Sequence, residues 1–326
     1  MSANEVSVDG LVGRPAMAFR RHLTDSPQAI AYRRSSTGFR PAAIVVLVVL
    51  LVAMVGGAVA IYQLLTASGA PPIIPPAVRC QATIDDRTAS LTLEQSRNAS
   101  IIAGIAAQRG LAPRAVSIAI TTAFQESGIR NLDYGDRDSL GMFQQRPSQG
   151  WGTPEQVMDP YYATGKFFDE MVKVDDWSTA DIGGVAQEVQ RSGFPEAYDK
   201  HVATARLLAS SLSGQTPASW SCVVRDPAAA DPGRLSKVLK PAYGDAVTVR
   251  WSPASDTAPA IMTLSTTTPE VAWSAAAFAQ SWASQTGVTA VKLAGASWTA
   301  SPDALPGWVT IPDDATISDT TVLVVF

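Results

Sequence analysis

The chain has 326 residues and a net charge of −4, with 46% hydrophobic and 17% charged residues. This balance is typical of folded domains, and no strongly basic region lies outside the N-terminal segment, so we expect no nucleic-acid partner. The only histidines, His22 and His201, are too few for a histidine-based metal site or a Ser-His-Asp triad. We therefore expect neither a metal nor a cofactor.

Residues 1–40 are rich in Arg, Ser and Pro and lack periodicity, which predicts a disordered cytoplasmic tail. The next segment, residues 41–65, reads PAAIVVLVVLLVAMVGGAVAIYQLL and carries no charge. At about 1.5 Å per residue it is long enough for the roughly 30 Å hydrocarbon core of a bilayer. A signal peptide has an apolar region of about 7–15 residues near the N-terminus. We therefore expect a single transmembrane helix.

The charges around this segment predict its orientation. Several arginines precede it, and no Lys or Arg follows it until Arg79. The positive-inside rule then places the N-terminus in the cytoplasm and the domains that follow outside the cell membrane. Residues 66–79 are rich in proline and are expected to form a semi-rigid stalk.

Cys80 and Cys222 bracket the segment 80–222. Outside a membrane the two thiols would be oxidised, and a disulfide would close a loop worth at most about 5 kcal/mol of unfolding free energy. The alternative is a pair of buried free thiols. We expect the disulfide, and with it a stapled domain over 80–222.

The pattern within 80–222 is helical. Thr92 and Gln95 have the spacing of a capping box at the start of a first helix. Pro113 and Gly128 have the positions expected at the start and end of a second helix. Further helices are predicted over about 159–174, 179–191 and 195–214. The sequon Asn98-Ala99-Ser100 falls inside the first helix and carries little weight.

Residues 223–240 read as a linker and residues 241–326 as a small α/β domain of unknown role. Its expected strands are 246–251, 261–265, 288–294 and 321–326, with a helix over 268–287. The fold class is therefore predicted as mainly α: a helical domain after a single transmembrane helix, followed by a small α/β domain. Trp298 and Trp308 are expected to pack in its core rather than to stack on sugars.

Glu126 lies in the last turn of the second predicted helix. The negative end of the helix dipole disfavours an anion there, and partial burial beside Phe124 would act in the same direction. Both effects raise the pKa of the Glu126 carboxyl. A carboxylic acid that stays protonated near neutral pH is what cleavage of a glycosidic bond requires, because the leaving oxygen must receive a proton.

Glu126-Ser127 at a helix end, followed by Gly141-Met142-Phe143-Gln144, resembles the Glu-Ser and Gly-Leu-Met-Gln motifs of soluble lytic transglycosylases and goose-type lysozymes. The resemblance covers about residues 91–212. The block from Gly135 to Pro160 resembles more narrowly the lysozyme-like domains of membrane-anchored actinobacterial proteins. The resemblance implies a lysozyme-like helical fold for 80–222 and activity on peptidoglycan.

The same resemblance implies roles for individual residues. Glu126 matches the catalytic acid and Ser127 the serine that helps to fix it. Gly141 and Gln144 match the glycine and glutamine of the sugar-binding turn, while Met142 and Phe143 replace its Leu and Met. The family's Ala-Tyr-Asn-Ala-Gly stretch is absent. In its place the resemblance puts Gln190 near the Tyr-Asn position and matches Tyr198 to a later tyrosine.

The type of cleavage is left open. A hydrolase needs a second carboxylate, and Asp133, Asp136 and Asp138 are the candidates. A lytic transglycosylase needs none, because the muramyl 6-hydroxyl attacks its own anomeric carbon. The aspartates can also have a local role, accepting loop N–H groups and pairing with Arg137 or Arg146.

Amides and an indole in this region suit a polysaccharide, so Gln144, Gln145 and Trp151 are predicted sugar contacts, and Asp136 and Asp138 are included with them. The main prediction is a peptidoglycan-cleaving enzyme that acts on the MurNAc–GlcNAc bond, with a lytic transglycosylase favoured over a muramidase. The alternative is a non-catalytic cell-wall-binding or morphogenetic membrane protein. The expected partners are glycan strands, the membrane through one helix and, as an open option, an envelope protein complex.

Overall fold

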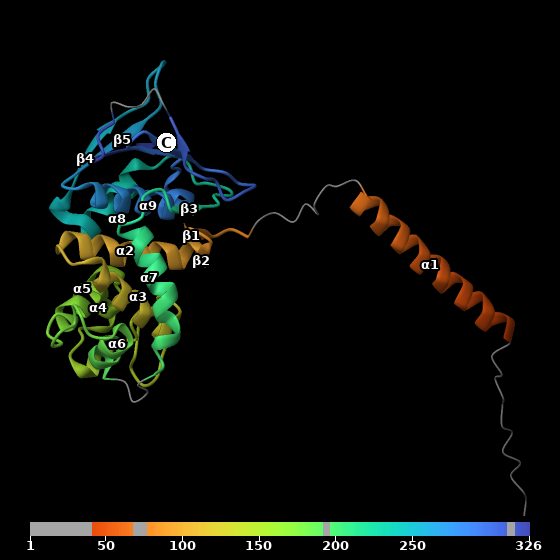
Figure 1. The fold of residues 1–326 in the computed structure, drawn as a ribbon, viewed down its shortest axis with the longest axis horizontal. Helices are drawn as coiled ribbons and strands as arrows, with labels where there is room; N and C mark the ends of the chain where they lie inside the picture. The colour runs from red at the N-terminus through yellow and green to blue at the C-terminus, as the bar shows by residue number, and fades with distance from the viewer. Residues whose placement is uncertain (1–40, 68–76, 192–195, 312–316) are drawn as a thin grey trace, which may run out of the picture. The chain divides into compact units, whose positions relative to one another are not determined.

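The computed structural model describes residues 41–67, 77–191, 196–311 and 317–326. The chain divides into two compact units, Met1–Ile73 and Ile74–Phe326 (Figure 1). The tail expected over 1–40 and the stalk residues 68–76 lie outside the described residues.

In the first unit, α1 (Pro41–Ala67) is helical as predicted. Across the described part of the chain, however, no helix combines the length and the apolar character needed to cross a membrane. This finding contradicts the predicted transmembrane helix and the single-pass localisation based on it.

The second unit contains the predicted helices. Thr92 forms the expected capping box with Gln95, and Gly128 ends the next helix in the left-handed conformation. The helices are α2 (Leu93–Gln108), α3 (Pro113–Ser127), α4 (Pro154–Val157), α5 (Pro160–Met171), α6 (Ile182–Gln190), α7 (Asp199–Leu212), α8 (Pro232–Tyr243) and α9 (Pro269–Thr286), with short 3-10 turns η1 (Pro147–Gln149) and η2 (Gly244–Ala246).

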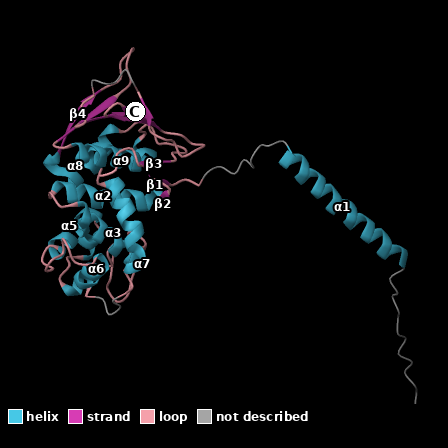
Figure 2. Cartoon of the chain, in the orientation of Figure 1, coloured by secondary structure: helices cyan, strands magenta, loops and turns pink. Residues whose placement is uncertain are grey.

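Two antiparallel sheets accompany these helices (Figure 2). The smaller one has the order β2 (Arg87–Leu91), β1 (Cys80–Ile84), β3 (Trp220–Cys222). The larger one has the order β4 (Val247–Ser252), β5 (Ile261–Thr266), β9 (Thr321–Val325), β6 (Ala290–Leu293), β7 (Ala296–Thr299), β8 (Val309–Thr310). Of the described residues, 48% are helical and 18% lie in strands, so the fold is mixed α/β and the prediction of a mainly α protein is wrong.

The strands β1, β2 and β3 were missed because their alternation is carried by small side chains. Ala82 and Ala89 are buried on β1 and β2, where longer apolar residues would have marked a strand. The hairpin turns at Asp85, which has a φ of 54°, a conformation that Asp tolerates better than most residues. Small apolar residues at alternate positions give a weak period-two signal.

The predicted disulfide between Cys80 and Cys222 is present and joins directly opposed residues of β1 and β3. Val223 N–H donates to the carbonyl of Arg79, and Thr83 N–H donates to that of Ser219. Because hydrogen-bonded and non-hydrogen-bonded pairs alternate in an antiparallel ladder, the two cysteines form a non-hydrogen-bonded pair. In such pairs the side chains approach most closely, which favours a cross-strand disulfide.

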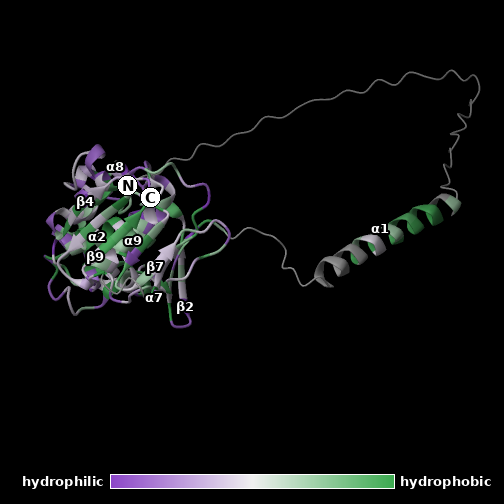
Figure 3. Cartoon of the chain, turned by 90° about the horizontal axis from the view of Figure 1, so that it is seen from above, coloured by the Kyte–Doolittle hydropathy of each residue, from purple (hydrophilic) through white to green (hydrophobic). Residues whose placement is uncertain are grey.

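Within the second unit, α9 lies between the six-stranded sheet and α2 (Figure 1). Hydrophobic residues gather where α2, α9 and β9 lie (Figure 3). α2 comes close to α8 at Gly104, where a Cβ would lie 2.9 Å from that of Ala242. The segment 223–240, predicted as a linker, thus contributes most of a helix with Leu235 and Leu239 in the core.

Trp298 lies in the core and Trp308 packs against it, as expected. Trp298 is fully buried and its indole N–H donates to Ser221, while Trp308 N–H donates to the carbonyl of Trp220. Trp220 N–H in turn donates to Ser281 of α9. These bonds tie the larger sheet and α9 to the disulfide-bearing strand β3.

Candidate active site

α3 holds Glu126 at a well-defined helix end. Pro113 occupies the first turn and Gly128 adopts φ 65° at the C-cap, where a glycine avoids the strain of a left-handed residue. The N–H groups of Gly128 and Ile129 donate to the carbonyls of Phe124 and Ala123. The last turn is therefore closed, and the direction of the Glu126 side chain is set by the helix.

Two amides from α2 hold the residues just beyond this end. Gln95 Nε2 donates to the carbonyl of Gly128 at 2.7 Å, and Asn98 Nδ2 donates to that of Ile129 at 2.8 Å. Asn98 is buried. Sequence reasoning missed this role. Its only signal was a polar residue on the apolar face of a helix, and that residue stood in a sequon.

Glu126 is half-buried and receives one strong hydrogen bond. The phenol of Tyr198 donates to Glu126 Oε1 at 2.6 Å. Tyr198 is 1% exposed and stands directly before α7, which packs against α3. The packing of the two helices thus brings together residues far apart in the sequence, and only the family resemblance had pointed to this tyrosine.

The environment of Glu126 favours its neutral form. Burial raises the pKa of the Glu126 carboxyl, and the Tyr198 hydrogen bond opposes this with a smaller lowering of the pKa. Desolvation penalises the charged state, whereas a donor stabilises it. Because burial is the larger effect, the carboxyl retains its proton to a higher pH than an exposed glutamate does.

Ser127 connects the helix end to the following loop. Its Oγ lies 2.7 Å from the carbonyl oxygen of Met142 and 3.1 Å from that of Ala123, and it accepts the N–H of Arg130 at 3.1 Å. The hydroxyl is buried. Ser127 therefore positions the Gly141–Gln145 loop against the end of α3, and its buried hydroxyl is engaged by backbone groups.

The loop itself is a tight turn. Leu140 and Gln145 exchange both backbone hydrogen bonds at 3.0 Å. Gly141 has φ +78°, and a Cβ there would clash with the carbonyl of Val157. Gln144 also has a positive φ, and its side-chain amide donates to the carbonyls of Gly141 and Tyr134. Gly141 thus has the backbone role expected of it, and Gln144 braces the turn.

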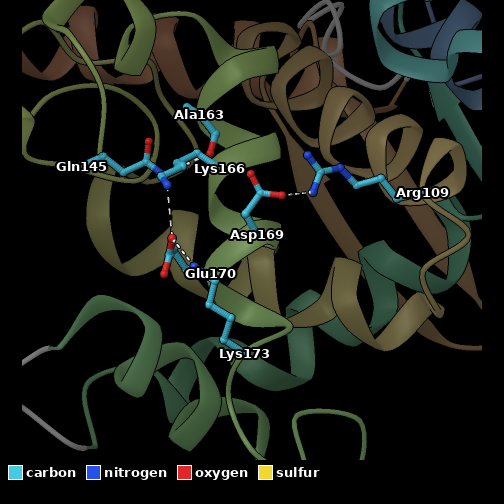
Figure 4. Close-up of polar contacts among 7 residues, drawn as sticks. All are labelled: Arg109, Gln145, Ala163, Lys166, Asp169, Glu170 and Lys173. Atoms are coloured by element: carbon cyan, nitrogen blue, oxygen red, sulfur yellow. Dashed lines mark hydrogen bonds and ion pairs between the residues drawn. The ribbon is translucent and has the colours of Figure 1, made fainter. Parts of the chain in front are cut away.

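Two of the predicted substrate contacts in this loop, Met142 and Gln145, lie in the core, as does their neighbour Phe143. Met142 and Phe143 are fully buried, and Phe143 stacks on Phe167 of α5. Gln145 is 1% exposed and its Nε2 donates to the carbonyl of Ala163, towards which its side chain points in Figure 4. The structure places these three side chains where they support the loop rather than at a surface.

The aspartates of the loop differ in their surroundings. Asp138 accepts the guanidinium of Arg146 at 2.9 Å and the N–H of Ser148 at 2.7 Å, and these donors hold the pKa of its carboxyl far below the usual range. The side chain of Asp136 is 91% exposed, 3.8 Å from that of Arg137. Asp133 is exposed. Asp138 is therefore an ionised anchor between the loop and η1.

Trp151 is half-buried and lines a separate hollow of about 100 Å³. Lys166 and Glu170 of α5 share its wall, and Glu170 accepts hydrogen bonds from Lys166 and Lys173 (Figure 4). Glu126 is not part of this lining. The indole and the catalytic candidate therefore do not face the same hollow.

Gln190 of α6 donates through Nε2 to the carbonyl of Phe143 at 2.8 Å. The family resemblance places this residue near the Tyr-Asn position. In the structure it secures the far side of the Gly141–Gln145 loop, while Ser127 secures the near side. The loop is thus held from two helices.

The structure brings together Glu126, Tyr198, Ser127 and the backbone of the Gly141–Gln145 loop, while the side chains of Gln145 and Trp151 point elsewhere. Among the described residues, the arrangement is one half-buried carboxyl with one donor beside a braced turn. No protein-family model matches the chain, and no curated protein is significantly similar to it.

Proposed function

We propose that the protein cleaves the glycan strands of peptidoglycan at the MurNAc–GlcNAc bond, with Glu126 as general acid and then general base. The observation that carries this proposal is the half-buried Glu126 carboxyl, whose pKa burial raises, bound at one oxygen by Tyr198. A protonated carboxyl is the group that glycosidic cleavage needs.

Tyr198 determines which oxygen acts in the first step. Oε1 accepts the phenol hydrogen at 2.6 Å, so the acidic proton resides on Oε2. Glu126 Oε2–H donates this proton to the glycosidic oxygen, which leaves as O4 of the GlcNAc unit while the C1–O bond of MurNAc breaks. The carboxylate that remains keeps its hydrogen bond from Tyr198, and charge-assisted hydrogen bonds are the stronger ones.

In the second step the 6-hydroxyl of the same MurNAc attacks C1. Its proton passes to the Glu126 carboxylate, a C1–O6 bond forms, and the 1,6-anhydro product leaves. The enzyme returns to its protonated state without water as a reactant. One carboxyl of suitable pKa thus serves both steps.

The surroundings of the aspartates support a transglycosylase over a muramidase. Asp138 is engaged by Arg146 and Ser148, and Asp136 lies on an exposed turn beside Arg137. Among the described residues, no hydrogen bond links any of these carboxylates to Glu126. A hydrolase requires the second carboxylate at a set distance across the scissile bond.

One observation favours a second candidate, a non-catalytic cell-wall-binding protein with the same arrangement. Trp151, the aromatic residue best suited to stack on a sugar, lines a hollow that does not include Glu126. A glycan bound there would be held without contacting the acid from that hollow. The Tyr-Asn motif of the resembling family is also absent.

The test is mass spectrometry of isolated sacculi digested with the full chain. We expect anhydro-muropeptides from the wild type and a loss of roughly 10²–10⁴-fold in their release by Glu126→Gln, the range for removal of a general acid–base. Glu188→Gln, an exposed glutamate of α6, is the matched control and should retain activity. Reducing-end products would contradict the transglycosylase assignment, and binding without any product would contradict catalysis in favour of the second candidate.

A further inference from the structure

We propose that the open edge of the six-stranded sheet, at β4, binds an extended acidic segment of a partner protein as an added strand. This inference is independent of the proposed glycan cleavage, because the site belongs to the sheet and α8 rather than to α3. β4 is the terminal strand in the order β4-β5-β9-β6-β7-β8.

The ladder shows which backbone groups face the open edge. Phe326 N–H donates to Ala260 and Thr266 N–H to Thr320, so the even-numbered residues of β5 face β9. Its odd-numbered residues therefore face β4, where they oppose residues 248, 250 and 252. Backbone groups of one strand alternate in direction. The N–H and C=O groups of Val247, Val249 and Trp251 consequently point away from the sheet.

These groups are free to pair with another strand. Among the described residues, no hydrogen bond joins the backbone of Val247, Val249 or Trp251 to any segment beyond the β4–β5 ladder. β4 contains no proline and no bulge, the features by which proteins usually protect an edge strand. An extended peptide would satisfy the unpaired groups, which is how strand addition generates affinity.

The side chains of the same three residues line a groove between β4 and α8. One hollow of about 460 Å³ is lined by Val249, Trp251 and Met262 with Pro232, Gly233 and Ser236 of α8. A second, of about 380 Å³, shares Val249 and Ser236 and continues along Val247 to Lys240. The indole of Trp251 is 41% exposed. Alternate side chains of an added strand point to the same face and are spaced about 7 Å along the strand. They would therefore enter the two hollows one after the other.

The charges at this edge favour an acidic occupant. Lys237 and Lys240 lie exposed on α8, and Arg250 lies exposed on the other face of β4. None of the three has an ion pair among the described residues, and Asp245 is the carboxylate in the lining of the second hollow. A strand with apolar side chains towards the groove and carboxylates towards Arg250 complements this pattern. Pairing of β4 with β4 of a second copy would bring Arg250 close to the second copy's Arg250 or lysines. Repulsion between these like charges works against self-pairing.

The test is fluorescence polarisation of a fluorescein-labelled Val-Glu-Val-Glu-Val-Glu peptide titrated with the full chain. We expect saturable binding and at least tenfold weaker binding of the matched Val-Lys-Val-Lys-Val-Lys peptide. Hydrogen–deuterium exchange should show protection of 247–252 when the acidic peptide is added.

Two variants separate the edge from general effects on folding. Val249→Pro removes an outward N–H without interrupting the ladder to β5, and should weaken binding at least tenfold. Ile311 N–H donates to Gly295, so Thr310 of β8 faces the opposite open edge, and Thr310→Pro should leave binding within twofold. Arg250→Glu, on the face that meets the carboxylates, should reduce the preference for the acidic peptide even if Val249→Pro fails to fold.

The proposal would be overturned by equal binding of the two peptides, by wild-type binding of the acidic peptide by Val249→Pro, or by protection that appears outside β4 and α8. A dimer of the chain that Val249→Pro dissociates, without any peptide binding, would overturn it in favour of an interface between copies. None of these results bears on Glu126, so loss of muropeptide release and loss of peptide binding are distinguishable.

Discussion

Glu126 and Asp138 belong to one polar stretch of sequence, yet the structure gives their carboxyl groups opposite properties. Glu126 is shielded at the end of α3 and has one donor, Tyr198, and burial raises its pKa. Asp138 lies in the loop, where Arg146 and Ser148 together lower its pKa. The surroundings of Glu126 favour its protonated form, and the surroundings of Asp138 favour its ionised form.

The difference shows how one polar segment can contain both a carboxylate that fixes the loop and a carboxyl that remains available for chemistry. Asp138 accepts two donors and so fixes the loop, and the loop in turn is fixed to α3 through the Ser127–Met142 hydrogen bond. Among the described residues Glu126 has a single donor, Tyr198, which bonds Oε1 and leaves Oε2 for the proposed chemistry. Carboxylates whose surroundings shift their pKa values in opposite directions are a recurring mark of acid–base sites.

We expect the largest loss of stability from Gly141→Ala, which disturbs the contact between the loop that Asp138 fixes and the end of α3 that carries Glu126. The new Cβ would meet the carbonyl of Val157 in a backbone of positive φ, and we expect a loss of about 3 kcal/mol in the free energy of unfolding. Muropeptide release should fall with it, because the loop would move from α3. Denaturant unfolding measures the stability.

The control is Gly110→Ala, at a helix end with φ +64° and open space around the position. It introduces the strain of a left-handed residue without the clash, so we expect a loss of about 1 kcal/mol in the free energy of unfolding. Equal losses in the two variants would mean that the contact with Val157 is not what positions the loop.

Local signals predicted much of the helical scaffold that carries Glu126. The capping box at Thr92, Pro113 in a first turn and Gly128 at a C-cap act over a few residues and survive in the structure. Glu126 was predicted as the catalytic acid from its place in such a helix together with the family resemblance, and this assignment stays a prediction. These are the features that a sequence encodes nearly independently of tertiary packing.

The remainder depends on contacts that the sequence does not display. Gln145 looked like a sugar ligand because amides bind sugars, but packing against α5 buries it. The segment 223–240 resembled a linker, yet the apolar residues Leu235 and Leu239 of α8 find partners across the chain. The buried positions of the smaller sheet include small residues such as Ala82 and Ala89. The alternating pattern that predicts a strand was therefore weaker than the helical pattern of the neighbouring segments.

Tyr198→Phe tests the Glu126 side of this contrast, because it removes the one hydrogen bond that the side chain of Glu126 receives from the described residues. Without the donor the carboxylate is less stable, so the pKa of Glu126 should rise further and the alkaline limb of the pH–rate profile should move to higher pH. We expect the rate to fall about tenfold, in line with loss of one hydrogen bond to a charged group. Tyr134→Phe is the control, since the Tyr134 side chain is 64% exposed.

A profile of unchanged shape in Tyr198→Phe, with a lower rate at every pH, would assign the tyrosine a structural role only. A profile that shifts to lower pH would contradict the hydrogen bond as a stabiliser of the anion. The two outcomes are distinct because the first concerns the position of Glu126 and the second its charge.

The smallest effects are expected on the pH dependence of stability, measured by denaturant unfolding between about pH 3 and pH 7 for Glu126→Gln and Asp138→Asn. An unfolded glutamate or aspartate titrates near about pH 4. For Glu126 the folded-state pKa is raised, so the native state binds more protons and its stability decreases as pH rises through that pKa. Glu126→Gln removes this decrease and should therefore gain stability relative to the wild type from acid to neutral pH.

For Asp138 the sign is reversed. Its folded-state pKa is lowered, so its contribution to stability is present above the unfolded value and is lost as pH falls. Asp138→Asn should therefore be most destabilising at neutral pH and approach the wild type in acid. Trends of the same sign in the two variants would contradict the contrast between a shielded acid and a donor-bound anion, whereas opposite trends would support it without any assay of activity.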